Sequence, residues 1–137
     1  MRTSFLVLAS AVFALSACSS TGDSSPTIGG TYTGSYTSFT NGYQGTISVV
    51  IPNIVSESTF SWSATGNVDV KGSDSPVSMS GTGEYVFPDI AFTVEGTGAG
   101  SDRTLFGTVG SGGASITASQ TAILLGTATE ERFDVTR

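Results

Sequence analysis

Residues 59–71, TFSWSATGNVDVK, show the clearest structural pattern of the chain. Phe60, Trp62, Ala64, Val68 and Val70 occupy positions of one parity, and the positions between them hold Ser, Thr, Asn, Asp and Lys. Successive side chains of a strand point to opposite faces of a sheet. The stretch therefore predicts a long β-strand with one buried face and one polar face.

Similar alternation continues on both sides of this stretch, and from residue 31 onward we find no convincing 3.6-residue periodicity. The pattern predicts an all-β, antiparallel meander, most simply an up-and-down β-barrel, because closure removes the exposed strand edges. A two-sheet β-sandwich is the alternative. The eight expected strands cover residues 31–40, 43–51, 58–71, 76–87, 90–97, 103–110, 113–123 and 127–137.

Turn residues predict which strand positions face each other. Asn41-Gly42 is typical of a two-residue type I′ hairpin loop, and further loops are expected at 72–75, 88–89 and 110–113. The loop at Pro88 should be wider than two residues because proline cannot take positive φ. These loops pair Tyr36 with Ile47, Val70 with Val77, Phe87 with Ile90, and Val109 with Ala114. All four pairings place apolar residues on one common face.

The composition of this single-domain chain excludes several kinds of catalytic, metal and binding site. Its 137 residues include one Cys and no His, with 5 basic and 11 acidic residues and a net charge of −6. One cysteine cannot form an intramolecular disulfide, and the absence of histidine removes most catalytic dyads and zinc sites. The acidic balance argues against nucleic acid as a partner.

The remaining polar residues predict no catalytic residue, metal site or cofactor. The carboxylates lie in expected turns or on outward positions, except Glu131, which shares the parity of Phe133 and either faces the rim or follows a bulge. Asp69 and Asp74 flank a hairpin but provide too few ligands for a firm calcium site. Lys71 lies beside a turn, where a Ser–Lys dyad is not expected. We therefore expect a protein that is not an enzyme.

The N-terminus has the pattern of a secretion signal. Arg2 is followed by residues 5–17, which are apolar apart from serine. A membrane-spanning helix needs about 20 apolar residues, so this run predicts a cleaved signal. The lone cysteine, Cys18, lies directly after it.

Leu15-Ser16-Ala17-Cys18 resembles the lipobox of bacterial lipoproteins. The resemblance implies signal-peptide cleavage between Ala17 and Cys18 and attachment of acyl chains to Cys18, which would anchor the protein to membrane lipid. Ser19 is similar to the residue that follows the cysteine in outer-membrane lipoproteins. The implied location is the bacterial cell envelope, lipid-anchored, in the outer membrane, facing the periplasm or the surface. An ordinary cleaved signal with an incidental cysteine is the alternative.

Residues 19–30, SSTGDSSPTIGG, contain too few apolar side chains to fold alone. We expect residues 1–17 to be the signal peptide, 18–30 a lipidated flexible tether, and 31–137 a single folded domain.

The folded domain resembles the lipocalin and avidin-like barrels at its two ends. Residues 30–34, GTYTG, stand where those families have a Gly-x-Trp strand, with Tyr32 in place of Trp, and residues 133–137, FDVTR, end with an arginine. The resemblance implies that Arg137 lies over Tyr32. A terminal arginine in solvent is equally compatible with the sequence.

Two functions remain open. In the first, an adaptor or structural lipoprotein meets an envelope protein through outward apolar residues such as Val50, Val86, Ala91 and Phe106. In the second, the barrel binds a small apolar ligand, and the candidate ligand-binding residues are Tyr32, Tyr36, Trp62 and Tyr85. A solid interior with an outward aromatic patch would favour the adaptor. An internal cavity of about 300 Å³ or more with converging polar groups would favour the ligand-binding barrel.

Overall fold

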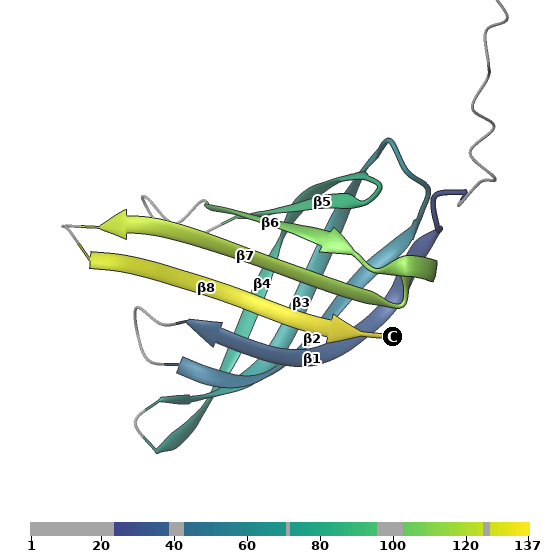
Figure 1. The fold of residues 1–137 in the computed structure, drawn as a ribbon. Coiled ribbons are helices and arrows are strands. Elements are labelled where there is room, and N and C mark those ends of the chain that lie inside the picture. Colours follow the sequence, from purple (N-terminus) through teal and green to yellow (C-terminus); the bar gives the residue numbers. More distant parts are fainter. Residues whose placement is uncertain (1–23, 39–42, 71, 96–102, 125–126) are drawn as a thin grey trace, which may run out of the picture.

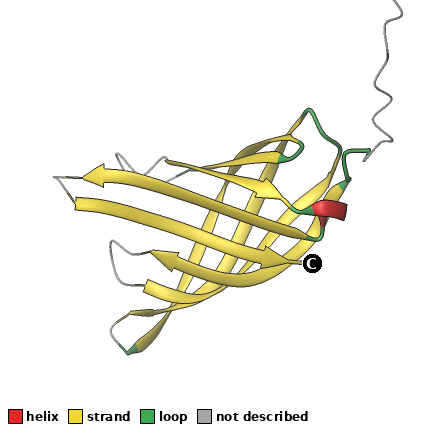
Figure 2. Ribbon diagram, in the orientation of Figure 1, coloured by secondary structure: helices red, strands yellow, loops and turns green. Residues whose placement is uncertain are grey.

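The protein is a closed barrel of eight antiparallel strands arranged in chain order, in which the first strand pairs with the last. The computed structural model describes residues 24–38, 43–70, 72–95, 103–124 and 127–137. The strands, shown in Figures 1 and 2, are β1 (Ile28–Ser38), β2 (Tyr43–Ile54), β3 (Ser58–Val70), β4 (Ser73–Val86), β5 (Asp89–Val94), β6 (Arg103–Val109), β7 (Ser115–Leu124) and β8 (Thr127–Thr136). The prediction of an up-and-down β-barrel is confirmed, and the sandwich alternative is wrong.

Alternation along the strands builds the core, as predicted. In β3 the side chains of Phe60, Trp62, Ala64 and Val68 are buried, while the residues between them are mostly exposed. The inward residues of all eight strands form one hydrophobic cluster. A single inward face on every strand is what allows the sheet to close around its own side chains.

The predicted registers are wrong by an even number of residues. Tyr36 lies opposite Gly45 rather than Ile47, and β6 pairs Val109 with Ile116 rather than with Ala114. An even shift keeps every side chain on its face. The inward and outward assignments therefore survive although the predicted pairs do not. Residues 39–42, which include the predicted Asn41-Gly42 loop, lie outside the described residues.

Two hairpins are tighter than predicted. Val70 pairs with Ser73, so β4 begins at residue 73, and the amide of Gly72 donates a 2.6 Å hydrogen bond to Asp69 Oδ1. Gly72 has a φ of 86°, a value that glycine adopts without strain. Val86 pairs with Asp89, and the two residues between them, Phe87 and Pro88, are joined by a cis peptide.

Glycines at inward positions let the strands bend sharply. A Cβ added to Gly34 would overlap the carbonyl oxygen of Asp134 on β8, and one added to Gly107 would overlap that of Thr117 on β7. No side chain fits between backbones that come so close. These glycines thus permit the curvature that closure requires.

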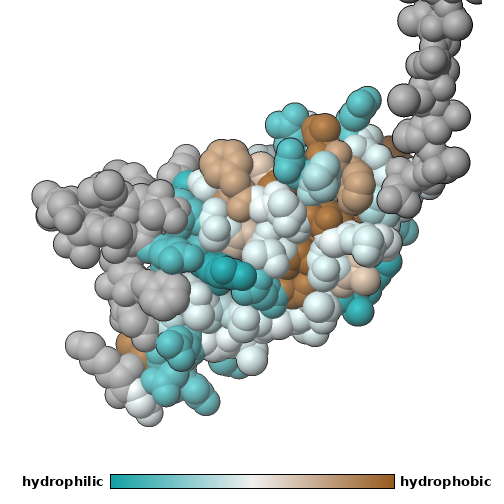
Figure 3. Space-filling view, in the orientation of Figure 1, coloured by the Kyte–Doolittle hydropathy of each residue, from teal (hydrophilic) through white to brown (hydrophobic). Residues whose placement is uncertain are grey.

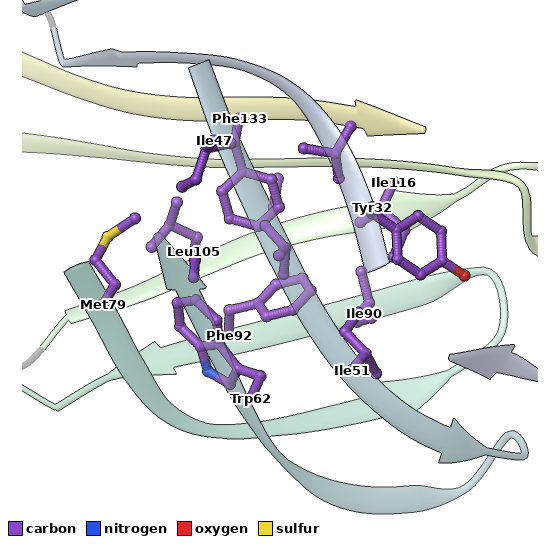
Figure 4. Close-up of a cluster of buried hydrophobic side chains, with 14 of the residues drawn as sticks. Tyr32, Ile47, Ile51, Trp62, Met79, Ile90, Phe92, Leu105, Ile116 and Phe133 are labelled. Atoms are coloured by element: carbon purple, nitrogen blue, oxygen red, sulfur yellow. The ribbon is translucent and has the colours of Figure 1, made fainter. Parts of the chain in front are cut away.

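Aromatic rings fill the middle of the barrel (Figure 4). Phe92 makes edge-to-face contacts with Phe60, Trp62 and Phe133, at centroid distances of 5.7, 5.1 and 5.1 Å. Such pairs contribute about 0.5–1.5 kcal/mol each beyond the area they bury. Phe92 of β5 therefore links β3 and β8, neither of which is a neighbour of β5 in the sheet.

The barrel has two distinct ends. The end that we call the N-terminal end holds the start of β1, the C-terminus and the β2–β3, β4–β5 and β6–β7 connections (Figure 1). The opposite end holds the end of β1 and the starts of β6 and β8. In the described part of the chain, we find no helix with the length and apolar character needed to cross a bilayer.

Candidate functional site

The N-terminal end is sealed by neutral polar contacts to the main chain. Tyr32 donates a 2.8 Å hydrogen bond to the carbonyl oxygen of Gly113, and Tyr85 donates one of 2.7 Å to that of Pro26. Burial raises the pKa of the Tyr85 hydroxyl, and Tyr32 raises it further. Neutral hydroxyls paired with carbonyls satisfy these buried groups without charge.

Arg137 lies over Tyr32, as the barrel resemblance implied. Its Cζ atom is 5.7 Å from the ring centroid, and Nη1 donates a 3.1 Å hydrogen bond to the carbonyl oxygen of Gly29. A cation–π contact at an exposed site contributes about 0.5–1 kcal/mol. The prediction of this contact is confirmed, and the alternative of a free terminal arginine is wrong.

The fold begins earlier than expected. Ile28 is fully buried and starts β1, three residues before the predicted boundary at Thr31. The contacts of Pro26 and Gly29 join this segment to β4 and to the C-terminus. The expectation of a flexible tether as far as residue 30 is therefore wrong for residues 28–30. The composition of 19–30 concealed this because one buried isoleucine among polar residues gives no periodic signal.

The opposite end contains an internal ion pair. Both oxygens of Glu131 accept hydrogen bonds from Arg103, one of them at 2.6 Å from Nη2, and Tyr36 donates a 2.8 Å hydrogen bond to Glu131 Oε1. The side chain of Glu131 is 11% exposed and that of Arg103 is 29% exposed. We call Tyr36, Arg103 and Glu131 the internal polar cluster.

The pKa values of two members of this cluster, Tyr36 and Arg103, are raised. Burial raises the pKa of Tyr36 far above its ordinary value, and the adjacent Glu131 carboxylate adds to the rise. The hydrogen bonds to Glu131 raise the pKa of Arg103. Both effects favour a neutral tyrosine and a charged arginine around the carboxylate. The cluster is therefore an ion pair with a protonated phenol attached.

Sequence reasoning identified only part of this cluster. Glu131 was singled out for its inward parity, and it does face inward, but the β7–β8 register is continuous, so the alternative of a bulge is wrong. Arg103 was missed, although it shares the parity of the buried Leu105. Gln120, opposite Glu131 in the register, was also missed; its Oε1 atom is buried without a hydrogen-bond partner.

The four predicted ligand-binding residues lie inside the barrel but do not form one site. Tyr32 and Tyr85 belong to the N-terminal end, whereas Tyr36 belongs to the internal polar cluster. Trp62 Nε1 donates to the carbonyl oxygens of Thr82 and Thr93, at 3.1 and 3.2 Å, and its ring faces Phe92. Figure 4 shows the Tyr32 hydroxyl directed away from the Trp62, Phe92 and Phe133 rings. All four residues thus bond to the protein's own groups.

An apolar groove lies on the outer face of β4, β5 and β6. We call it the β4–β6 groove; its cavity volume is about 370 Å³. Phe106 is 68% exposed and Val86 is 44% exposed, so both predicted outward positions are confirmed. Figure 3 shows brown, apolar surface on the β5–β6 side of the face in view. The side chains that line it outside the barrel are those of Glu84, Val86, Asp89, Ala91 and Phe106.

A second outer cavity, of about 580 Å³, lies over β1, β2 and β3. Its side chains are mainly hydroxyls, from Thr33, Ser35, Thr46, Ser48 and Thr65. Val50, the fourth predicted outward apolar residue, is exposed on β2 and does not line the β4–β6 groove. Neither cavity lies in the barrel interior.

Within the described ranges, no group of three or more Cys, Asp or Glu side chains could hold a metal ion. Asp69 and Asp74 are cross-strand partners, and Asp69 stabilises the turn between them by accepting the Gly72 amide. On β8, Arg132 pairs with Asp134 and holds the pKa of that carboxyl below its ordinary value. Ala17, Cys18 and Lys71 lie outside the described residues.

Comparisons with known proteins found no matching family model, no matching curated protein and no matching solved structure.

Proposed function

We propose that this protein is a lipid-anchored lipoprotein of the bacterial cell envelope whose small barrel acts, without catalysis, as an adaptor that binds another envelope protein. The anchor is supported by the lone cysteine at position 18, which follows an apolar run and completes Leu15-Ser16-Ala17-Cys18. Acyl chains on that cysteine hold a protein at a membrane stably when two or more are present.

The contacts of Pro26 support an arrangement in which such an anchor would hold the N-terminal end of the barrel near the bilayer. Pro26 is bonded to Tyr85 at the N-terminal end, eight residues after Cys18. An extended chain covers at most about 3.6 Å per residue, so this end would stay within about 29 Å of the lipid. The internal polar cluster would then face away from the membrane.

The adaptor role rests on one observation, a large aromatic side chain, Phe106, exposed in an apolar groove on the outside of a barrel. Single exposed apolar residues are common on protein surfaces. A contiguous patch that contains an aromatic residue is more typical of a protein–protein contact. Phe106, Ala91 and Val86 belong to neighbouring strands of one sheet and line the same groove.

A ligand-binding barrel is the less favoured alternative. The hydroxyl or N–H group of each predicted ligand-binding residue already bonds within the protein, and three aromatic rings meet around Phe92. A guest in the middle of the barrel would have to displace these rings. Native mass spectrometry of the purified protein tests the alternative directly, since a stoichiometric bound small molecule would support it.

The anchor is tested by Cys18→Ala in cells, with Ser19→Ala as a matched control. We expect Cys18→Ala to abolish incorporation of labelled palmitate and to release the protein from the membrane fraction, whereas Ser19→Ala keeps the acyl chains. Continued acylation or membrane association of Cys18→Ala would refute the lipoprotein proposal. The adaptor role is tested by crosslinking in intact envelopes, where a defined crosslinked protein is expected.

A further inference from the structure

We propose that the β4–β6 groove docks a segment of a partner protein that presents one large apolar side chain beside a lysine or arginine. The inference deepens the proposed adaptor function and rests on it, because it specifies the chemistry of the partner.

The shape of the groove suits an apolar side chain. The strand registers place Glu84, Ala91 and Phe106 side by side on β4, β5 and β6, and Val86 beside Asp89 in the next row. Ala91 is small and lies between Glu84 and the exposed Phe106, and the exposed Val86 lies diagonally across from Phe106 in the next row. The result is a depression bordered by Phe106 and Val86 at opposite corners, which fits a single large apolar side chain. Burial of such a side chain contributes about 1.5–3 kcal/mol.

A pair of carboxylates gives the groove negative charge. Glu84 and Asp89 line it together with the apolar residues, and no basic side chain does. In the described part of the chain neither carboxylate takes part in a salt bridge; the arginines Arg103 and Arg132 pair with Glu131 and Asp134 instead. A cationic side chain in the partner would therefore meet uncompensated negative charge, which favours association and selects against acidic partners.

Charge also decides between the possible occupants. In a symmetric dimer the same patch of two copies meets itself, so Glu84 and Asp89 would approach their own counterparts. An anionic lipid surface would be repelled in the same way. A partner segment with basic and apolar side chains is the occupant whose charge and polarity both complement the groove.

The groove is preorganised. Its side chains are carried by three hydrogen-bonded strands, and Thr93 and Thr104 form a 3.2 Å hydrogen bond between β5 and β6 one row away. A rigid surface loses little conformational entropy on binding. We therefore expect measurable affinity even for a short peptide.

The test uses the full chain carrying Cys18→Ala, so that binding is measured without an anchor. The probe is a fluorescent pentapeptide, Gly-Lys-Phe-Lys-Gly, and its matched controls are Gly-Ser-Phe-Ser-Gly and Gly-Glu-Phe-Glu-Gly. Fluorescence anisotropy is expected to rank the three peptides in that order, with the acidic peptide binding at least about tenfold more weakly than the basic one. Amide chemical shifts should change around Ala91 and Phe106.

Variants locate the binding site. Phe106→Ser is expected to weaken the basic peptide about tenfold or more, as removal of a central interface aromatic does. Val50→Ser, which removes another exposed apolar residue, this one from β2, should leave binding unchanged. The double variant Glu84→Gln, Asp89→Asn should weaken binding about threefold to tenfold and remove most of its dependence on salt. All of the substituted side chains are exposed, so the variants are expected to fold. Circular dichroism checks that each variant does so.

Four results would overturn the inference. These are equal binding of the basic and acidic peptides, equal effects of Phe106→Ser and Val50→Ser, a Phe106-dependent dimer in sedimentation, and Phe106-dependent binding to phosphatidylglycerol vesicles. The last two would assign the groove to a second copy or to a membrane. Because the peptide assay needs no acyl chain, it can fail while the Cys18 test succeeds, and the reverse also holds.

Discussion

The two ends of the barrel close the same interior by different chemistry. At the N-terminal end, tyrosine hydroxyls donate to main-chain carbonyls. There Arg137, the last residue, also bonds to Gly29 at the start of β1. At the opposite end, the charged pair of Arg103 and Glu131 holds the hydroxyl of Tyr36. At the N-terminal end, tyrosine hydroxyls and the Arg137 guanidinium bond to the main chain, whereas the opposite end is closed by an ion pair between side chains.

Because the two ends use different interactions, they should contribute differently to the free energy of unfolding. Neutral hydrogen bonds to carbonyls keep the same strength over a wide range of pH, whereas an ion pair must first compensate the cost of removing two charges from water. We therefore expect the N-terminal end to contribute more to stability, and the opposite end to be more sensitive to single substitutions that leave one charge behind.

The largest effect is expected from Tyr32→Ala. It removes a fully buried ring and its hydrogen bond to Gly113 from the N-terminal end, and loss of a buried aromatic costs about 3–5 kcal/mol. Urea unfolding measures the loss. The matched control Tyr32→Phe keeps the ring and should cost only about 0.5–1.5 kcal/mol. Similar losses for the two variants would show that packing is not what closes this end.

Glu131→Ala should follow. It removes the Glu131 carboxylate from its pair with the partly buried Arg103, at an expected cost of about 2–4 kcal/mol, reduced from that of a fully buried pair because Arg103 retains contact with water. The double variant Arg103→Met, Glu131→Leu should cost much less, since it removes both charges. If the double variant proves as unstable as the single one, the ion pair stabilises this end more than we propose.

A third prediction separates the ends by pH. In the unfolded chain tyrosine ionises near its ordinary pKa of about 10, whereas the fold raises the pKa of Tyr36. Above pH 10 the unfolded chain thus binds fewer protons than the folded one, so the free energy of unfolding should fall as pH rises.

Tyr36→Phe tests this difference. At pH 8 it should cost about 1.5–3 kcal/mol, the contribution of a hydrogen bond to a charged group. Above pH 10 its stability should fall less steeply with pH than that of the wild type, by up to one proton per molecule. Some slope will remain because Tyr85 also has a raised pKa. Parallel pH profiles for the two proteins would contradict the prediction.

Arg137→Ala is expected to have the smallest effect, about 1 kcal/mol, because it removes an exposed cation–π contact and one hydrogen bond. Arg137→Lys keeps the charge but has a less suitable shape for stacking, and should be intermediate. Thermal melting in low and high salt measures both variants. A loss as large as that of Tyr32→Ala would mean that the C-terminus, rather than the tyrosine ring, closes the N-terminal end.

The sequence was sufficient for the architecture because alternation identifies inward residues without reference to their partners. It was insufficient for the registers, since the pairing of Tyr36 with Gly45 and the predicted pairing with Ile47 bury the same faces. The internal polar cluster is harder still to predict from the sequence. Arg103 and Glu131 lie on β6 and β8, which β7 separates, so their contact depends on how the sheet curves across β7. The outward positions of Val86, Ala91 and Phe106 could be predicted, but their adjacency in the groove depends on the registers.

The attachment of the N-terminus to β1 has a mechanical consequence. β1 is held on one side by β2 and on the other by β8, and both ladders run antiparallel to it. A pull on the residues before Ile28 acts along the strand, so the hydrogen bonds of both ladders are loaded together in shear and cannot open one after another. A pull on the chain before Ile28 would therefore meet the resistance of both ladders at once before β1 could leave the barrel.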